Sequence, residues 1–401
     1  MNRSRIATAL LAAALVPAAL IAVPARAQTT AQATMQTPLK IGMVVTLSGA
    51  LGAIGQEQVD GFQLGLDQRG GRLGGQAVQV IRLDDQGRPE IGVQHTRKLI
   101  EQDKVDLIVG VTASNVINAV APVITAAGIP FLGTNGGPSP LAGEQCSPLF
   151  VSTAFQNDGP HESMGQYAQQ QGYKRVVVMA PNYQAGKDAI AGFKRFYKGQ
   201  VAAEVLPALG QADFAVELTQ MQAARPDAVF AFFPGGMGIN FVKQWQQAGL
   251  GATLPLLSAF TVDDMTLPAL RDAAVGVVTG AHWTSSMATP AARKFVADYE
   301  TKFKKRPSNY AVQGYDAAML LDQALERTKG NPMDARDLVR TMRSIRLESP
   351  RGTIGFGPNG FPVQDYAAWT TVKQPDGAVG FQLRGVMLKE HRDAYVGQCK
   401  G

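Results

Sequence analysis

The sequence predicts an α/β protein with two lobes, each built around a parallel central sheet. Short apolar runs alternate with amphipathic helical segments from residue 39 to residue 281, which is the pattern of strands joined by right-handed helical crossovers. The alternation pauses near residue 150 and then restarts. The 401 residues also exceed what a single hydrophobic core usually holds. Two domains of similar size are therefore expected.

The first 27 residues have the form of a secretory signal peptide. An arginine-containing start precedes an apolar core rich in alanine and leucine at 6–23, and Ala25, Arg26 and Ala27 fit the small-x-small cleavage rule. Pro17 within the apolar core disfavours the alternative of a transmembrane anchor. Cleavage after Ala27 lowers the formal net charge from +6 to +3, because three arginines and no acidic residue are removed. We expect an exported protein, and the bacterial periplasm fits best.

The first half of the alternation contains four expected strands and three expected helices. The strands are short apolar runs, typical of strands buried on both faces. The helices carry apolar residues at helical spacing, as Val59, Phe62 and Leu66 do, and Gly128 is the residue type that ends a helix. The strands are expected at 39–46, 76–83, 105–109 and 129–132, and the helices at 56–68, 90–102 and 115–127.

The second half restarts after a crossing segment at 150–157. Helices are expected at 159–171, 187–198, 214–224 and 239–248, and strands at 175–180, 200–206, 227–233, 255–258 and 275–281. After His282 the pattern becomes helical at 289–303, 310–328 and 333–344. It ends in strands at 352–356, 367–373 and 381–388, the last two joined by a turn sequence.

Composition argues against two classes of partner. No run of lysine and arginine is long enough to mark a nucleic-acid footprint, and the densest, at 302–306, is interpreted as a solvated helix end. After residue 28 no segment approaches the roughly 20 consecutive apolar residues that a membrane span needs.

The two cysteines, Cys146 and Cys399, are far apart in the sequence. In an oxidising compartment such cysteines can pair, and this bond would tie the C-terminal tail to the start of the second lobe. The alternative is two buried free thiols. We favour the disulfide.

Small polar residues follow two neighbouring strands of the first lobe. Ala113 and Ser114 follow one strand, and Asn135, Gly136 and Gly137 follow the next. In an open parallel sheet, ligands bind outside the carboxyl ends of the strands. A hydroxyl, an amide and free backbone N–H groups near a helix N-terminus suit a carboxylate. The alternative is that Ser114 only caps its helix.

Aromatic residues mark the strand ends of the second lobe. Tyr183, the pair Phe232 and Phe233, and Phe260 lie at or just past expected strands. Several aromatic side chains at one edge of a sheet can line a site for an apolar or aromatic ligand. We expect Tyr183, Phe233 and Phe260 to face the ligand. The alternative is ordinary core packing.

The sequence offers little for catalysis, and no enzyme, metal or cofactor is expected. The four histidines lack metal-ligand spacing. The glycines at 49, 52 and 55 follow G-x-x-G-x-x-G rather than the dinucleotide fingerprint G-x-G-x-x-G, and neither a P-loop nor G-x-S-x-G occurs. These absences also disfavour the rival of an NAD-dependent dehydrogenase.

Several segments together resemble the periplasmic solute-binding proteins of the Leu/Ile/Val-binding type, which serve ABC importers. They are LKIGMVVTLSGALGAIG, DDQGRPE, VDLIVGVTASN, GIPFLGTNGG, PNYQAGKDA, PDAVFAFFPGG and NYAVQGYDAA. The resemblance implies two Rossmann-like lobes, at 37–153 plus 284–349 and at 154–283 plus 350–401, joined by three crossover segments. It also implies a monomer that closes on its ligand by hinge motion and binds ABC permease subunits. The rival role is a periplasmic ligand-sensing adaptor for a receptor.

The sequence departs from the amino-acid binders of that family in the second lobe. Ser114 stands where the family has its carboxylate-binding serine, but Phe260 aligns with the acidic residue that holds the ligand's ammonium. Ala185 replaces a common tyrosine. A desolvated ammonium without a counter-charge is costly. We therefore expect a carboxylate with an apolar or aromatic body, such as an aromatic acid or a 2-oxo acid.

Overall fold

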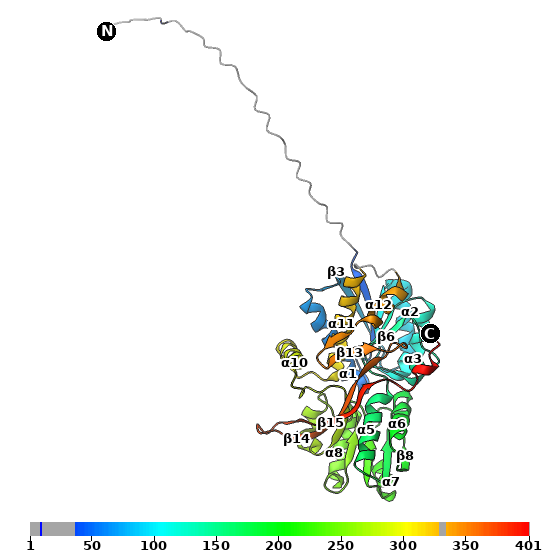
Figure 1. The fold of residues 1–401 in the computed structure, drawn as a ribbon, viewed down its shortest axis with the longest axis vertical. Coiled ribbons are helices and arrows are strands. Elements are labelled where there is room, and N and C mark those ends of the chain that lie inside the picture. The colour runs from blue at the N-terminus through cyan, green and yellow to red at the C-terminus, as the bar shows by residue number, and fades with distance from the viewer. Residues whose placement is uncertain (1–8, 10–36, 329–333, 401) are drawn as a thin grey trace, which may run out of the picture. The chain divides into compact units, whose positions relative to one another are not determined.

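The computed structural model describes residues 37–328 and 334–400, together with residue 9. Apart from residue 9, the predicted signal peptide and its cleavage site lie outside the described residues. Thr37–Gly401 forms one compact unit (Figure 1). Within the described part of the chain, no helix is long and apolar enough to cross a membrane.

The first sheet has six strands in the order β2-β3-β1-β4-β5-β6. Every pairing is parallel except that of β2 with β3, as the expected helical crossovers require. All residues of β4 are buried, which is typical of a strand covered on both faces. The strands are β1 (Leu39–Val45), β2 (Arg72–Leu73), β3 (Gln76–Asp84), β4 (Leu107–Gly110), β5 (Phe131–Gly133) and β6 (Phe150–Ser152).

The second sheet has nine strands, in the order β12-β13-β14-β11-β10-β9-β7-β8 with β15 paired to β14. Strands β7 to β11 pair in parallel, but β14 pairs antiparallel with β11, β13 and β15. The sheet is therefore mixed rather than parallel as expected, because the chain re-enters it in the opposite direction. The strands are β7 (Arg175–Met179), β8 (Gln200–Val205), β9 (Ala228–Ala231), β10 (Leu256–Ser258), β11 (Val278–Ala281), β12 (Leu347–Ser349), β13 (Gly352–Phe356), β14 (Pro362–Lys373) and β15 (Val379–His391).

Helices cover both sheets, and the late helical segment returns to the first sheet. α11 (Asn309–Arg327) packs along α1 (Gly52–Gln68), and the approach is close: a Cβ added at Gly61 would lie 1.9 Å from the carbonyl oxygen of Ala311. This places the segment with the first lobe, while the lobe boundaries themselves stay a prediction. The other helices are α2 (Pro89–Lys98), α3 (Ser114–Ala126), α4 (Ser139–Ala142), α5 (Asp158–Gln170), α6 (Gln184–Phe196), α7 (Ala215–Ala223), α8 (Gly236–Gln247), α9 (Leu267–Leu270), α10 (Pro290–Phe303) and α12 (Ala335–Ser344).

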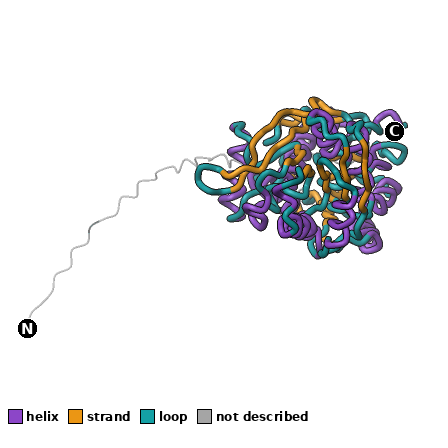
Figure 2. Tube along the Cα trace, turned by 90° about the horizontal axis from the view of Figure 1, so that it is seen from below, coloured by secondary structure: helices purple, strands orange, loops and turns teal. Residues whose placement is uncertain are grey.

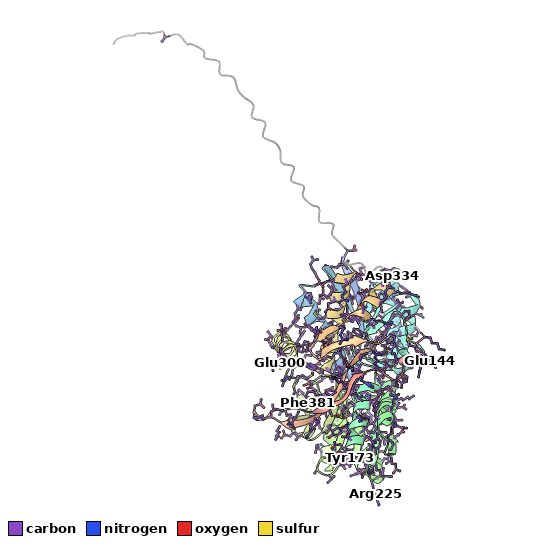
Figure 3. All side chains as sticks on the ribbon, in the orientation of Figure 1. Glu144, Tyr173, Arg225, Glu300, Asp334 and Phe381 are labelled. Atoms are coloured by element: carbon purple, nitrogen blue, oxygen red, sulfur yellow. A yellow bond between two sulfur atoms is a disulfide. The ribbon has the colours of Figure 1, made fainter. Side chains whose placement is uncertain are left out.

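The last two long strands form an extended antiparallel hairpin that runs along the edge of the unit (Figures 1 and 2). Phe381 on β15 is buried in the core of the second lobe, whereas the labelled side chains Glu144, Glu300 and Asp334 are exposed and point outward (Figure 3). The hairpin strands are longer than expected from the sequence, because backbone pairing continues past their apolar segments.

Two covalent or ionic ties hold the segments that run between the sheets. Cys146 and Cys399 form a disulfide with their Cα atoms 5.5 Å apart, which joins the C-terminal tail to the segment before β6. Arg351, in the turn between β12 and β13, is paired with Asp316 of α11 at 2.9 Å, and both side chains are almost fully buried. Arg351 also donates to the carbonyl oxygen of Ala154, at 3.0 Å, in the first crossing segment.

Candidate functional site

A narrow pocket opens between the carboxyl ends of strands from the two sheets. It encloses about 410 Å³ of empty space, of which only about 30 Å³ is wide enough for the centre of a water molecule. A flat group therefore fits it better than a bulky one. Its lining residues are Leu51, Ile54, Thr112, Ser114, Asn135, Phe155, Asn157, His161, Tyr183, Ala185, Phe232, Pro234, Phe260 and Tyr310.

No Asp, Glu, Lys or Arg belongs to this lining, which consists wholly of described residues. Asp263, outside this lining, accepts through its Oδ1 from the backbone N–H groups of Thr266 at 2.9 Å and Met265 at 3.1 Å, and its Oδ2 is buried without a hydrogen-bond partner among the described residues. Burial raises the pKa of Asp263 to about 6. The lining residues themselves thus offer an ammonium group no counter-charge.

Ser114 and the first turn of α3 form the polar end of the pocket. Ser114 is the first residue of α3, and in the first turn of a helix the backbone N–H groups have no acceptor within the helix. The Ser114 Oγ accepts from the Asn157 Nδ2 at 3.1 Å, and its contact with the Asn157 Oδ1 is long, at 3.5 Å. The Ser114 hydroxyl proton is therefore held only by a long hydrogen bond to Asn157, which a ligand oxygen can replace. Donors of this kind at a helix N-terminus suit an anion.

Asn157 is held in place from behind by a buried carboxylate. Its Nδ2 donates to the Asp188 Oδ2 at 2.8 Å, and its Oδ1 accepts from the Gly137 N–H at 3.0 Å. Asp188 also accepts from the Ser139 Oγ at 2.7 Å, and burial raises its pKa. These hydrogen bonds fix the orientation of the Asn157 side-chain amide next to Ser114.

The expected free backbone N–H groups of the second turn are absent, so that prediction is wrong for Gly136 and Gly137. The Gly136 N–H donates to the Val111 carbonyl oxygen at 2.9 Å, and the Gly137 N–H is bound by Asn157. Gly137 is needed for space instead, since a Cβ there would lie 2.0 Å from the Phe155 carbonyl oxygen. Both glycines shape the turn by allowing backbone to approach backbone.

Of the two predicted site residues Ala113 and Asn135, only Asn135 lines the pocket. Ala113 precedes α3 and is buried in the apolar core, outside the pocket lining, because its methyl group packs inward where the turn enters the helix. Asn135 does line the pocket; its Nδ2 donates to the Thr112 carbonyl oxygen at 2.7 Å. Its Oδ1 is buried and has no partner among the described residues.

Aromatic rings form the walls of the pocket. Phe155 and Phe260 stack with their ring centroids 4.9 Å apart, and Tyr183 lies nearly parallel to Phe232 with centroids 6.4 Å apart. Phe260 has a φ of +59°, in the left-handed region that costs a bulky residue about 1–2 kcal/mol. The fold tolerates this strain at the position where the side chain lines the pocket.

Phe233 does not line the pocket, and its neighbour Phe232 does. Phe233 is fully buried and packs against Phe214 and Phe241, with centroids 4.9 Å and 4.8 Å away. Successive side chains of an extended segment point to opposite faces, so only one of the pair can reach the pocket. The sequence located the pair but could not show which of the two side chains faces the pocket.

We expect substitutions at these two adjacent positions to separate binding from stability. Phe232→Leu should weaken binding of an aromatic ligand several-fold, because a ring–ring contact contributes about 0.5–1.5 kcal/mol, and leave the fold stable. Phe233→Leu should lower the free energy of unfolding by about 1–2 kcal/mol without changing affinity. Calorimetric titration and urea unfolding of both variants check this; the reverse assignment of effects would contradict it.

Several lining residues were not predicted from the sequence, among them three in segments that it had marked. Phe155 and Asn157 belong to the segment recognised only as a crossing, and Tyr310 to the motif NYAVQGYDAA, which was not assigned a role. A crossing segment between two lobes must pass the cleft, so its position could have indicated that Phe155 and Asn157 line the pocket. His161 on α5 gave none, because an isolated histidine in a helix has no characteristic spacing.

His161 is the single titratable imidazole in the pocket lining. It is 1% exposed, its Nδ1 has no hydrogen-bond partner in the described part of the chain, and burial lowers its pKa to about 3. It is therefore neutral at physiological pH. In the described residues no group of three His, Cys, Asp or Glu side chains is placed to hold a metal ion.

Comparison with known proteins gives a consistent result. A sequence profile described as periplasmic binding protein matches residues 38–377. Leu/Ile/Val-binding protein homolog 6 of Brucella melitensis is 26% identical over 332 residues, which are 80% of this chain and 84% of the relative.

Two solved structures are similar along most of their length. A solute-binding protein of an ABC transporter from R. palustris, in complex with benzoate, has a TM-score of 0.85 and 28% identity, covering 91% of this chain and 100% of that one. A solute-binding protein of an ABC transporter from Rhodopseudomonas palustris BisB5, in complex with 3,4-dihydroxybenzoic acid, has a TM-score of 0.84 and 31% identity, covering 89% and 99%.

Proposed function

Since the chain belongs to the periplasmic binding protein family, as a periplasmic solute-binding protein of an ABC transporter, we propose that its ligand is an aromatic carboxylate. The carboxylate would lie at the N-terminus of α3, against Ser114. The ring would lie between the aromatic side chains contributed by the second lobe and the crossing segment.

The observation that carries this proposal is the absence of charge from a pocket with one polar, anion-suited end. A free amino acid needs a partner for its ammonium as well as for its carboxylate, and a desolvated charge without a partner is costly. The described lining provides Ser114 for the carboxylate but no acidic side chain for the ammonium. A ligand whose only charge is a carboxylate avoids that cost.

The shape of the pocket supports an aromatic body. The free space is narrow, which suits a flat ring. Such a ring can pack against the aromatic side chains of the lining with favourable contact. Ala185 lines the pocket with a single methyl group, which leaves room that a larger side chain would fill. The benzoate and 3,4-dihydroxybenzoic acid complexes of the two similar solute-binding proteins support the same class of ligand, whereas the name of the Brucella relative points to amino acids.

We further propose that the protein binds its ligand without converting it and passes it to an ABC permease. The pocket is lined from both lobes, so closure of one lobe on the other would enclose the ligand and create the surface that the permease recognises. We propose that the protein does so as a monomer.

A ligand screen by thermal shift and calorimetric titration tests the proposed function. Benzoate is expected to raise the melting temperature, because a ligand that binds only the native state stabilises it. Benzamide has the same shape without the charge and should raise it much less. Leucine and valine should give no shift. A shift with leucine or valine and none with aromatic acids would overturn the proposal.

A further inference from the structure

His161 is a polar side chain placed in an apolar part of the pocket without a protein partner. Its ring centroid lies 4.8 Å from that of Phe232, 5.7 Å from Phe230 and 6.0 Å from Phe260. The Nδ1 of this imidazole is buried and makes no hydrogen bond to another described residue. Buried polar groups are almost always paired, so an unpaired imidazole in a binding pocket indicates a partner supplied by the ligand.

The imidazole is suited to a neutral partner. Burial in this aromatic surrounding lowers the pKa of His161 to about 3, so the side chain carries no charge at neutral pH. A neutral imidazole has one N–H donor and one acceptor nitrogen. A hydroxyl group, which both donates and accepts, can pair with either nitrogen.

The position of His161 relative to Ser114 follows from α5. Asn157 immediately precedes this helix, and His161 lies four residues later, one helical turn along the same face. Residues at this spacing are about 5–6 Å apart. Asn157 contacts Ser114 at 3.1 Å, so His161 lies one helical turn from the residue that holds the end of the pocket that suits a carboxylate.

We propose that His161 recognises a hydroxyl group on the ring of the ligand, at the edge away from the carboxylate, so that hydroxylated aromatic carboxylates are preferred over unsubstituted ones. This inference rests on the proposed function, since it assumes a carboxylate at Ser114. It assigns the two ends of the ligand to different lobes: the first lobe binds the acid and α5 of the second lobe selects the ring substituent.

Asn135 also has an unpaired side-chain atom in the lining, but it does not lie near the ring edge away from the carboxylate. Its Nδ2 is bonded to the carbonyl oxygen of Thr112, two residues before Ser114, so it lies at the carboxylate end. Its free Oδ1 is an acceptor beside the anion site and cannot pair with the carboxylate itself.

The test compares benzoate, 3-hydroxybenzoate and 4-hydroxybenzoate by calorimetric titration of wild type and His161→Phe. Phenylalanine keeps a flat ring among its aromatic neighbours and removes both nitrogens. In the wild type we expect at least one hydroxybenzoate to bind about 10-fold more tightly than benzoate, the worth of one hydrogen bond to a buried group. In H161F that preference should vanish or reverse, while benzoate affinity changes by no more than about 3-fold.

Two further variants complete the design. His95→Phe is the control. His95 lies on α2, outside the pocket lining, so this variant should leave all three affinities unchanged. The ligand-free H161F protein should melt at a higher temperature than the wild type, because it lacks the unpaired polar atoms. Asn135→Ala should leave the preference among the three acids unchanged, because Asn135 lies at the carboxylate end.

The outcomes separate the two proposals. If the wild type binds benzoate at least as tightly as both hydroxybenzoates, or if H161F keeps the wild-type preference, the role of His161 is overturned while the aromatic-carboxylate function stands. A loss of preference in N135A rather than in H161F would overturn it too. If none of the three acids binds, the proposed function fails and the role of His161 fails with it.

Discussion

Replacing Ser114 with aspartate is expected to weaken benzoate binding about 1,000-fold. The new carboxylate would stand at the N-terminus of α3, where the ligand carboxylate is proposed to lie. Two like charges about 4 Å apart repel by about 4 kcal/mol near a protein surface, and every 1.4 kcal/mol changes affinity tenfold. Calorimetric titration of the variant measures the loss directly.

Ser114→Asn is the matched control, because asparagine has the size of aspartate without its charge. We expect a loss of about 10-fold or less for S114N, from the displaced hydroxyl alone. Ser114 is buried, so the new charge of S114D should cost the ligand-free protein some stability, which the favourable interaction of an aspartate with the helix dipole partly offsets. Equal losses of affinity in S114D and S114N would place the ligand carboxylate elsewhere.

Replacing Arg351 with methionine is expected to lower the free energy of unfolding by about 3–5 kcal/mol. Its partner Asp316 would be left as a buried charge with no opposite charge, and breaking a buried pair on one side has about this effect. Arg351 also donates to Gln364 at 2.7 Å, to the Ala154 carbonyl oxygen and to the Thr153 carbonyl oxygen. Urea unfolding of the variant provides the measurement.

The loss in R351M should be smaller at pH 5 than at pH 8. Burial raises the pKa of Asp316 from 3.8 to about 6, and removing the guanidinium, which lowers that pKa, raises it further. A carboxyl whose folded pKa lies above its unfolded value destabilises the fold as the pH rises through the folded pKa. At pH 5 the variant can therefore keep Asp316 protonated.

Arg340→Met serves as the control for this second prediction. Arg340 pairs with Asp337 on the exposed face of α12, with side chains 78% and 50% exposed, and exposed ion pairs contribute about 0–1 kcal/mol. R340M should therefore change stability little and without pH dependence. A similarly small effect of R351M would show that the crossing segments do not depend on the buried pair.

Most of the fold could be predicted because its signals are local. Apolar runs and helical spacing located β1, β3, β4 and α3 to within a few residues, and the family resemblance is confirmed by the profile match over residues 38–377. The antiparallel entry of β14 into the second sheet was not predictable in this way. Strand direction is decided by pairing partners that lie far away in the sequence.

The structure brings some of the predicted site residues to one pocket, and their role in ligand binding stays a prediction. Ser114, Asn135, Tyr183 and Phe260 all line it, whereas Phe233 faces the core and Phe232 takes its place. A shift of one residue in an extended segment exchanges the two faces, and neither phenylalanine carries a local mark of which face it takes. Composition alone could locate the pair but not orient it.

By itself the sequence determined the class of this protein, an α/β chain of the periplasmic binding protein family, and it placed a serine at a helix start and a phenylalanine where that family has an acid. These are properties of residue type and spacing, and they do not depend on distant contacts. Only the tertiary structure decided that the N–H groups of Gly136 and Gly137 donate to the Val111 carbonyl oxygen and to the Asn157 side chain, and that the His161 Nδ1 is unpaired in the pocket lining. Both facts depend on which hydrogen-bond donors and acceptors meet in the folded chain. Segments that are distant in the sequence form such bonds only after the chain has folded.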